Sequence, residues 1–262
     1  SMLVRAQDEG AIVKQERIDR SKGFFIGFGP SFTLGDNIGD YSTGFSIEAG
    51  FQKRVYRVFS IGPSISYMGF KYDPEAAEGA AGAFIQAIDD VNDPYYWEGY
   101  VIELTGGDLS LLSLALNLKI NFVPVKDDSK ISVYGFAKPF VTYASRTDVS
   151  GNSTYYKTTD PDGLTDWEVF DEDITWNSED YPILAADSEI TGGIFIGPGI
   201  EFAPAKKVSV FVQAAFGYTF PITYVSTGSY DETFDSYFDE EFPMVKEGFP
   251  SVNIQAGLSF NF

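Results

Sequence analysis

The chain of 262 residues contains neither cysteine nor histidine. Disulfide frameworks need cysteine, and most zinc sites need cysteine or histidine as ligands. The Ser-His-Asp triad needs a histidine as its base. Most hydrolase chemistry is therefore excluded before any motif is considered.

Basic residues are also scarce, because 18 Lys and Arg stand against 38 Asp and Glu, for a net charge of -20. Binding the phosphates of nucleic acid needs a dense set of Lys and Arg side chains. We therefore expect no nucleic-acid partner.

The third absence is a long apolar run of the kind a membrane helix requires, about 18 residues or more. The longest candidate, Leu111 to Ile120, is interrupted by Ser113, Asn117 and Lys119. A helical span is not expected, but a membrane barrel of short alternating segments has no such run to show. A content of 16% aromatic residues argues against a disordered acidic chain.

What the chain does contain is alternation of apolar and polar residues, as in Leu112, Leu114 and Leu116 against Ser113 and Asn117. This period of two predicts half-buried β-strands. Eight segments show it: 24–34, 44–51, 59–68, 112–122, 131–143, 193–202, 208–219 and 252–262.

A weak repeat recurs within these segments, with Pro30, Pro63, Pro139 and Pro198 each on the apolar face. Proline removes a hydrogen-bond donor from the strand ladder. We therefore expect a bulge or a register break at each of these prolines.

The connections between the segments alternate in length. Short ones at 52–57, 124–130 and 203–207 alternate with long acidic ones at 71–99, 147–187 and 225–248. Short turns on one side and long loops on the other are typical of outer-membrane barrels. Within the first long connection, Ala76 to Val91 is expected to form one short helix.

The two faces differ in side-chain size, since the apolar face carries branched and aromatic residues and the polar face mainly small ones. A soluble barrel or a two-layer sandwich stays open as an alternative, although its outer face would need charges for solubility. We predict an all-β fold, an eight-stranded antiparallel up-and-down transmembrane β-barrel with short periplasmic turns and long acidic extracellular loops. Aromatic residues near the long-loop ends are expected at headgroup level: Tyr41, Tyr67, Tyr72, Tyr95, Tyr96, Trp97, Tyr100, Tyr143, Tyr218 and Tyr224.

The eight segments and the terminal run Val252 to Phe262 resemble the outer-membrane β-barrel domain family that includes the OmpA-like and OmpX-like barrels. The resemblance covers residues 23–262, and residues 1–22 are interpreted as a signal-peptide remnant or N-terminal periplasmic segment. It implies a location in the bacterial outer membrane, in contact with lipid and lipopolysaccharide. It also implies that Phe260 and Phe262 form an insertion signal read by the barrel-assembly machinery.

Charges are rare on the predicted inner faces of the strands: Glu48, Lys119, Lys138 and Glu201. An eight-stranded barrel is narrow enough to be filled by side chains, so isolated charges there should pair. Our hypothesis is a bridging cluster that closes the lumen, and the alternative is a gated conduction site.

The long loops carry the remaining candidates. Trp167, Trp176, Tyr230 and Tyr237 are interleaved with acids and are possible binding residues. Three further residues, Asp160, Asp162 and Asp166, have a partial calcium-ligand spacing but lack the glutamate that completes an EF-hand loop. Solvated acidic loops that meet divalent ions at the lipopolysaccharide surface are the alternative, and we expect no resident metal or cofactor.

These observations favour a non-enzymatic, monomeric, porin-like barrel with a structural or surface-interaction role. An extracellular protein is its possible partner. The enzymatic barrels that this fold resembles, such as phospholipases, palmitoyl transferases and omptin-type proteases, depend on histidine, which is absent. A narrow transport or secretion-accessory barrel is the alternative function.

Overall fold

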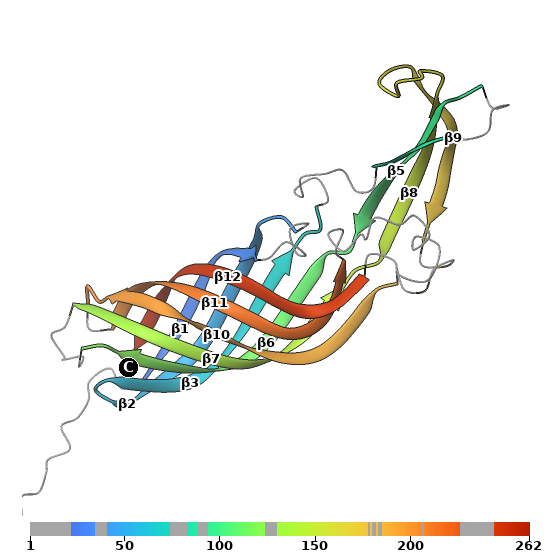
Figure 1. Ribbon diagram of the computed structural model, residues 1–262. Helices are drawn as coiled ribbons and strands as arrows, with labels where there is room; N and C mark the ends of the chain where they lie inside the picture. Colours follow the sequence, from blue (N-terminus) through green and yellow to red (C-terminus); the bar gives the residue numbers. More distant parts are fainter. Residues whose placement is uncertain are drawn as a thin grey trace, which may run out of the picture.

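Figure 1 shows a computed structural model of the chain. The residues that it describes are 22–34, 41–73, 83–88, 94–123, 130–177, 179, 182, 185–205, 207–225 and 244–262. The expected N-terminal segment 1–22 lies outside them, apart from Lys22, which begins the first strand. No helix within the described part is both long and apolar enough to cross a membrane.

Eight strands close into an antiparallel barrel in the order β1-β12-β11-β10-β7-β6-β3-β2. They are β1 (Lys22–Thr33), β2 (Gly44–Tyr56), β3 (Phe59–Phe70), β6 (Leu109–Asn121), β7 (Ile131–Arg146), β10 (Asp187–Phe202), β11 (Val208–Val225) and β12 (Met244–Asn261). The barrel closes because Phe24 of β1 pairs with Phe51 of β2 on one side and with Phe260 of β12 on the other. The predicted eight-stranded barrel is confirmed.

The two faces of each barrel strand follow the predicted alternation. In β6, Leu114 is 65% exposed on the outside, whereas its neighbour Ser113 is 1% exposed inside. Similar exposed apolar residues occur on all eight barrel strands. A continuous apolar exterior of this extent is suited to lipid rather than to water.

The prolines do not introduce the expected bulges. At Pro63, pairing with β2 is interrupted between Gly50↔Ser64 and Lys53↔Ile61, yet the register is the same on both sides of the gap. The opposite edge stays paired throughout, with Pro63 facing Leu116 of β6. Proline has no backbone N–H to donate to the neighbouring strand on one edge. The ladder on that edge is therefore interrupted, and the ladder on the other edge is unaffected.

Glycine precedes three of the four prolines, and the interrupted ladder explains why. A Cβ atom at Gly29, Gly62 or Gly197 would overlap a backbone carbonyl oxygen of the neighbouring strand. The Gly-Pro repeat therefore marks places where two strands approach closely without a hydrogen bond.

A second, four-stranded sheet in the order β4-β5-β8-β9 extends beyond the long-loop end of the barrel (Figure 1). Its strands are β4 (Ala83–Ala87), β5 (Trp97–Gly106), β8 (Val149–Thr158) and β9 (Trp167–Trp176). The expectation of a helix over Ala76 to Val91 is wrong, since the described part of that range contains β4. The connections 71–99 and 147–187 are likewise not simple loops.

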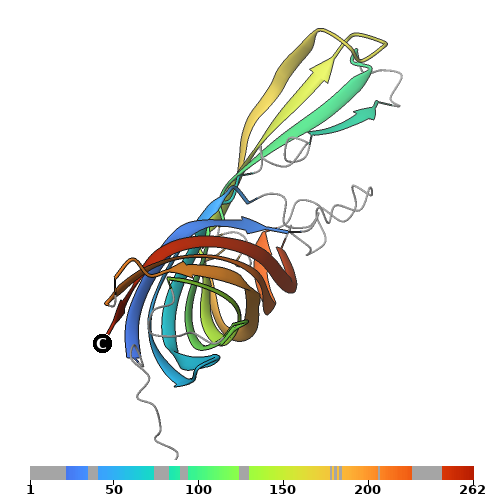
Figure 2. The same cartoon turned by 90° about the vertical axis from the view of Figure 1, so that its left-hand side faces the viewer.

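The second sheet continues two barrel strands. Leu109↔Arg146 is a pair of the β6–β7 ladder and Gly106↔Val149 a pair of the β5–β8 ladder, and both ladders keep one register. Between them, the Gly107 N–H donates to the Asp148 carbonyl at 3.0 Å. Gly106 and Gly107 have φ of 83° and 75°, which favours glycine. Figure 2 shows the sheet rising from one end of the barrel.

Candidate functional site

The four charges predicted to face inward form two ion pairs inside the barrel. Lys119 Nζ of β6 lies 2.5 Å from Glu201 Oε2 of β10, and Lys138 Nζ of β7 lies 2.6 Å from Glu48 Oε2 of β2. The Ser209 hydroxyl also donates to Glu201. Each lysine is therefore paired with a carboxylate across the lumen rather than along one strand.

Aromatic rings support both lysines. Lys119 Nζ lies 3.8 Å from the centroid of the Tyr134 ring, and Lys138 Nζ lies 4.7 Å from that of Phe136. A cation over a ring face is stabilised further by the ring quadrupole. Because the side chains of Lys138 and Glu48 are each only 5% exposed, their pairing is needed to offset desolvation.

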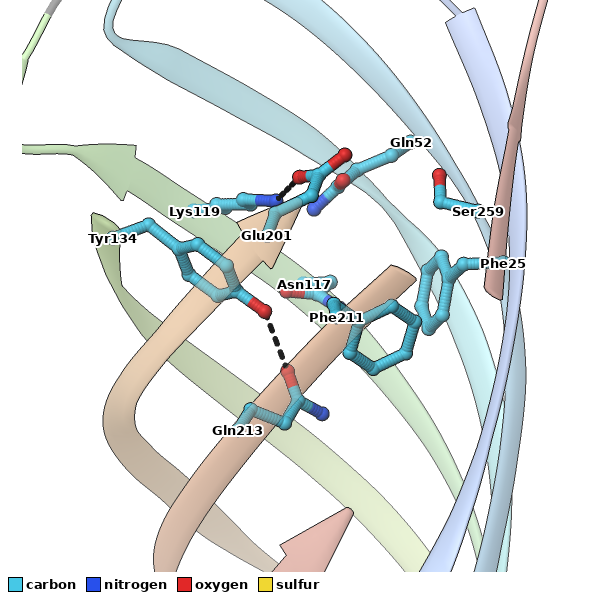
Figure 3. Close-up of a pocket in the computed structure, with 9 residues that line it drawn as sticks. All are labelled: Phe25, Gln52, Asn117, Lys119, Tyr134, Glu201, Phe211, Gln213 and Ser259. Atoms are coloured by element: carbon cyan, nitrogen blue, oxygen red, sulfur yellow. Dashed lines mark hydrogen bonds and ion pairs between the residues drawn. The ribbon is translucent and has the colours of Figure 1, made fainter. Parts of the chain in front are cut away.

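Figure 3 shows the side chains around the Lys119–Glu201 pair, with the Tyr134 hydroxyl directed toward Gln213. A cavity of about 20 Å³ lies beside the Lys119–Glu201 pair, which is room for about one water molecule. Its lining residues are Phe25, Gln52, Asn117, Lys119, Tyr134, Glu201, Phe211, Gln213 and Ser259. A second cavity of about 20 Å³ also borders Glu201, beside Arg54 and Ser60.

Inward rings and glycines on neighbouring strands fit together in the rest of the lumen. Phe140 and Phe195 stack with centroids 4.7 Å apart. A Cβ atom at Gly217 would collide with the Phe195 ring, and one at Gly199 with the Tyr134 ring. The small inner-face residues seen in the sequence thus make room for rings on adjacent strands.

At the long-loop end of the barrel, five aromatic residues form a buried cluster. Tyr41, Phe70, Tyr72, Tyr224 and Phe249 are each at most 5% exposed. Tyr41 is in edge contact with Tyr72, Tyr224 and Phe249, at centroid distances from 5.8 to 6.3 Å. Headgroup-level positions for Tyr41, Tyr72 and Tyr224 are therefore wrong, because these side chains point inward.

The loop candidates are not gathered into one site. Trp167 and Trp176 begin and end β9, where they pair with Thr158 and Gly151. Tyr230 and Tyr237 lie outside the described residues.

Asp160 organises the turn between β8 and β9. Its carboxylate accepts hydrogen bonds from the backbone N–H groups of Asp162, Leu164 and Thr165 at 2.9–3.1 Å. These bonds, the Asp162 one first, lower the pKa of Asp160 below its usual value. In the described part of the chain no group of three or more acidic side chains is placed to hold a metal ion, so Asp160, Asp162 and Asp166 do not converge.

The second sheet contains a feature that the sequence reasoning missed. Lys157 Nζ of β8 lies 4.7 Å from the ring centroid of Phe170, 5.5 Å from that of Tyr95 and 5.6 Å from that of Tyr155. The sequence signal is faint, because only Tyr155 and Lys157 share a strand face by spacing. We call Tyr95, Tyr155 and Phe170 the aromatic box.

Phe260 and Phe262 lie at the short-turn end, where they are 42% and 69% exposed. The Phe262 N–H donates to the Lys22 carbonyl at 2.9 Å, so the end of the chain completes the seam between β12 and β1.

No family model and no curated protein matches the chain. Among solved structures it is similar to Neisserial surface protein A, with 12% identity, a TM-score of 0.42 and coverage of 92% of this chain and 97% of that one. A major outer membrane protein from Thermus thermophilus matches at 9% identity and a TM-score of 0.42, covering 92% and 100%. OprG from Pseudomonas aeruginosa matches at 10% and 0.40, covering 92% and 96%.

The closed antiparallel barrel and its apolar exterior decide the fold. The chain is an outer-membrane-type β-barrel. The Thermus and Pseudomonas proteins are outer-membrane proteins. Identities this low say nothing of activity or partners.

Proposed function

We propose that this protein is a non-enzymatic barrel of the bacterial outer membrane that presents the second sheet to an extracellular protein partner. The observation that carries the proposal is the continuous register from β6 and β7 of the barrel into β5 and β8. A sheet fixed in this way is held away from the barrel end in a defined orientation, which lowers the entropy lost when a partner binds.

The surface of the second sheet suits an interface. Tyr96, Leu164, Val169 and Phe170 are 53%, 80%, 48% and 54% exposed, although they are large apolar residues. Acids surround them in the sequence, among them Glu168 next to Val169. Apolar anchors within a charged rim are typical of protein interfaces.

The lumen supports a binding role more than a transport role. Two ion pairs and inward rings fill its middle, and the five-residue aromatic cluster fills its outer mouth. We include in the proposal that the barrel acts as a monomer, contacts lipid and lipopolysaccharide, and is assembled through Phe260 and Phe262.

The test compares the full chain with a variant in which 74–106 and 149–185 are each replaced by a short Gly-Asn linker. We expect the variant to migrate as a folded, heat-modifiable barrel, because loop length has a small effect on stability. Attachment of expressing cells to protein-coated surfaces should fall to the level of cells without the protein. Undiminished attachment would contradict display by the sheet.

A second variant with 226–243 shortened tests the segment that contains Tyr230 and Tyr237. If only this variant loses attachment, the binding surface is that segment and not the sheet. Planar-bilayer recordings of the full chain address the transport alternative, for which steady single-channel conductance is the positive result.

A further inference from the structure

The aromatic box surrounds a cation on three sides. Its rings come from different segments: Tyr95 precedes β5, Tyr155 belongs to β8 and Phe170 to β9. Phe170 makes edge contacts with Tyr95 and Tyr155 at centroid distances of 5.8 and 5.6 Å. The Lys157 ammonium lies within about 6 Å of all three centroids, the range of cation–π attraction.

A carboxylate adds negative charge to the box. Glu98 is the register partner of Lys157 across β5 and β8, so the two side chains share a face. The Tyr155 hydroxyl donates to the Glu98 carboxylate, which holds this ring against the strand. Three rings and one carboxylate form the type of site that recognises organic ammonium groups.

The box differs from the two lysine–ring contacts inside the barrel in its number of rings. Lys119 Nζ lies 3.8 Å from the centroid of Tyr134 and Lys138 Nζ 4.7 Å from that of Phe136, one ring each, whereas Lys157 Nζ lies 4.7 to 5.6 Å from the centroids of three rings. A methyl group on nitrogen extends about 1.5 Å from it. If a methylated nitrogen took the place of Lys157 Nζ, 4.7 to 5.6 Å from the ring centroids, its methyl groups would therefore contact the rings.

We propose that the aromatic box is a binding site for a trimethylammonium group, as in choline, and that Lys157 occupies it as an exchangeable internal cation. Lys157 lies on a partly exposed surface, so its ammonium can return to water when a ligand enters. This inference deepens the proposed function, because it names the chemical class of ligand that the displayed sheet would bind.

The experiment measures choline binding to the full chain in nanodiscs of phosphatidylglycerol, which carry no choline headgroup. Fluorescence of Trp97 and Trp167 reports on the second sheet. Wild type should bind choline weakly and ammonium chloride not measurably. Lys157→Gln should bind choline about fivefold more tightly, because the competing internal cation is gone. Lys246→Gln is the matched control, since it removes the same charge from β12, where Lys246 pairs with Glu189 of β10.

Phe170→Leu keeps an apolar side chain but removes one ring. When it is combined with Lys157→Gln, the gain in choline affinity should be abolished. Heat-modifiable migration and the far-ultraviolet spectrum must match wild type in every variant. Equal affinities for Lys157→Gln and Lys246→Gln, or binding unchanged by Phe170→Leu, would overturn the proposal. If Lys157→Gln fails to fold, wild type and Phe170→Leu still test the proposal. Choline binding by wild type that is lost in Phe170→Leu supports the site, and no such difference overturns it.

Sedimentation with vesicles separates the two sources of the group. Binding to phosphatidylcholine but not to phosphatidylglycerol vesicles assigns the site to a lipid headgroup, and binding to free choline alone assigns it to a soluble ligand. Should choline fail to bind while removal of the sheet still abolishes cell attachment, the box inference fails and the proposed function stands.

Discussion

At the scale of the residue, neighbouring side chains in one strand meet different surroundings. Leu116 is 43% exposed on the barrel exterior near the middle of β6, and Asn117 is 4% exposed beside the lumen cavity. We predict that Leu116→Arg lowers the free energy of unfolding by about 2 to 4 kcal/mol, since arginine would face the bilayer centre. Asn117→Ser should have a small effect. Urea titration of barrels refolded in vesicles measures both, and equal losses would contradict the assigned faces.

The buried pair of Glu48 and Lys138 offers a second prediction. Glu48→Ala leaves Lys138 without its carboxylate in a buried site, which should cost about 3 to 5 kcal/mol. Glu48→Met combined with Lys138→Met should recover most of that loss, because no buried charge remains. Both variants should stay silent in planar bilayers if the pair fills the lumen. Channel openings in Glu48→Ala would instead identify the pair as a gate.

The pKa of Asp160 links the β8–β9 turn to pH. Because hydrogen bonds lower this pKa in the folded state, the carboxylate stabilises the turn above the ordinary value of 3.8. That stabilisation is lost as the pH falls through the lower folded pKa. The protection of the Leu164 and Thr165 amides, as exchange relative to the intrinsic rate at each pH, should fall in that acidic range. In Asp160→Asn the protection should not change across it, and an unchanged acid response in this variant would exclude Asp160 as the cause.

At the scale of the strand, the Gly-Pro repeat sets how closely two strands can approach. Gly197→Ala would force the new methyl group against the Ala214 carbonyl oxygen. We expect a loss of about 1 to 3 kcal/mol, as for other overpacked sites. Gly135→Ala is the control, because a Cβ atom there would come no closer than 3.3 Å to any neighbour, the Phe122 ring, and would stay 3.9 Å from the nearest backbone oxygen. Comparable stability of both variants would show that the strands separate easily at the interrupted ladder.

Alternation was sufficient to predict the barrel strands, since every one of them has exposed apolar residues on one face and packed side chains on the other. It was insufficient for the second sheet, because β8 reads Val-Ser-Gly-Asn-Ser-Thr and shows no sustained apolar face. The inward charges could be placed on a face by parity. Which lysine meets which glutamate depends on the relative position of strands across the lumen, and a local pattern does not contain that information. The aromatic box likewise needs the register of three segments.

At the scale of the whole molecule, the packing of the barrel interior is connected to the proposed display of the second sheet. An eight-stranded barrel is narrow enough for side chains to fill its interior, and two ion pairs and inward rings lie inside this one. The aromatic cluster of Tyr41 is buried at its long-loop end, and its exterior is apolar. The proposed recognition role therefore belongs to the second sheet, which extends beyond the barrel.

Closure of the barrel can be separated from the role of its terminal aromatics. Deleting Phe260 to Phe262 removes the pairs Phe24↔Phe260 and Gly23↔Asn261 from the β1–β12 seam. It also removes the bond from the Phe262 N–H to Lys22. We expect this deletion to prevent formation of the heat-modifiable barrel both in cells and in detergent, because an open seam exposes two strand edges to lipid. The double variant Phe260→Leu and Phe262→Leu keeps the seam, so it should fold in detergent yet assemble poorly in cells if the machinery reads the rings. Normal assembly of the double variant in cells would leave closure, and not an aromatic signal, as the role of these residues.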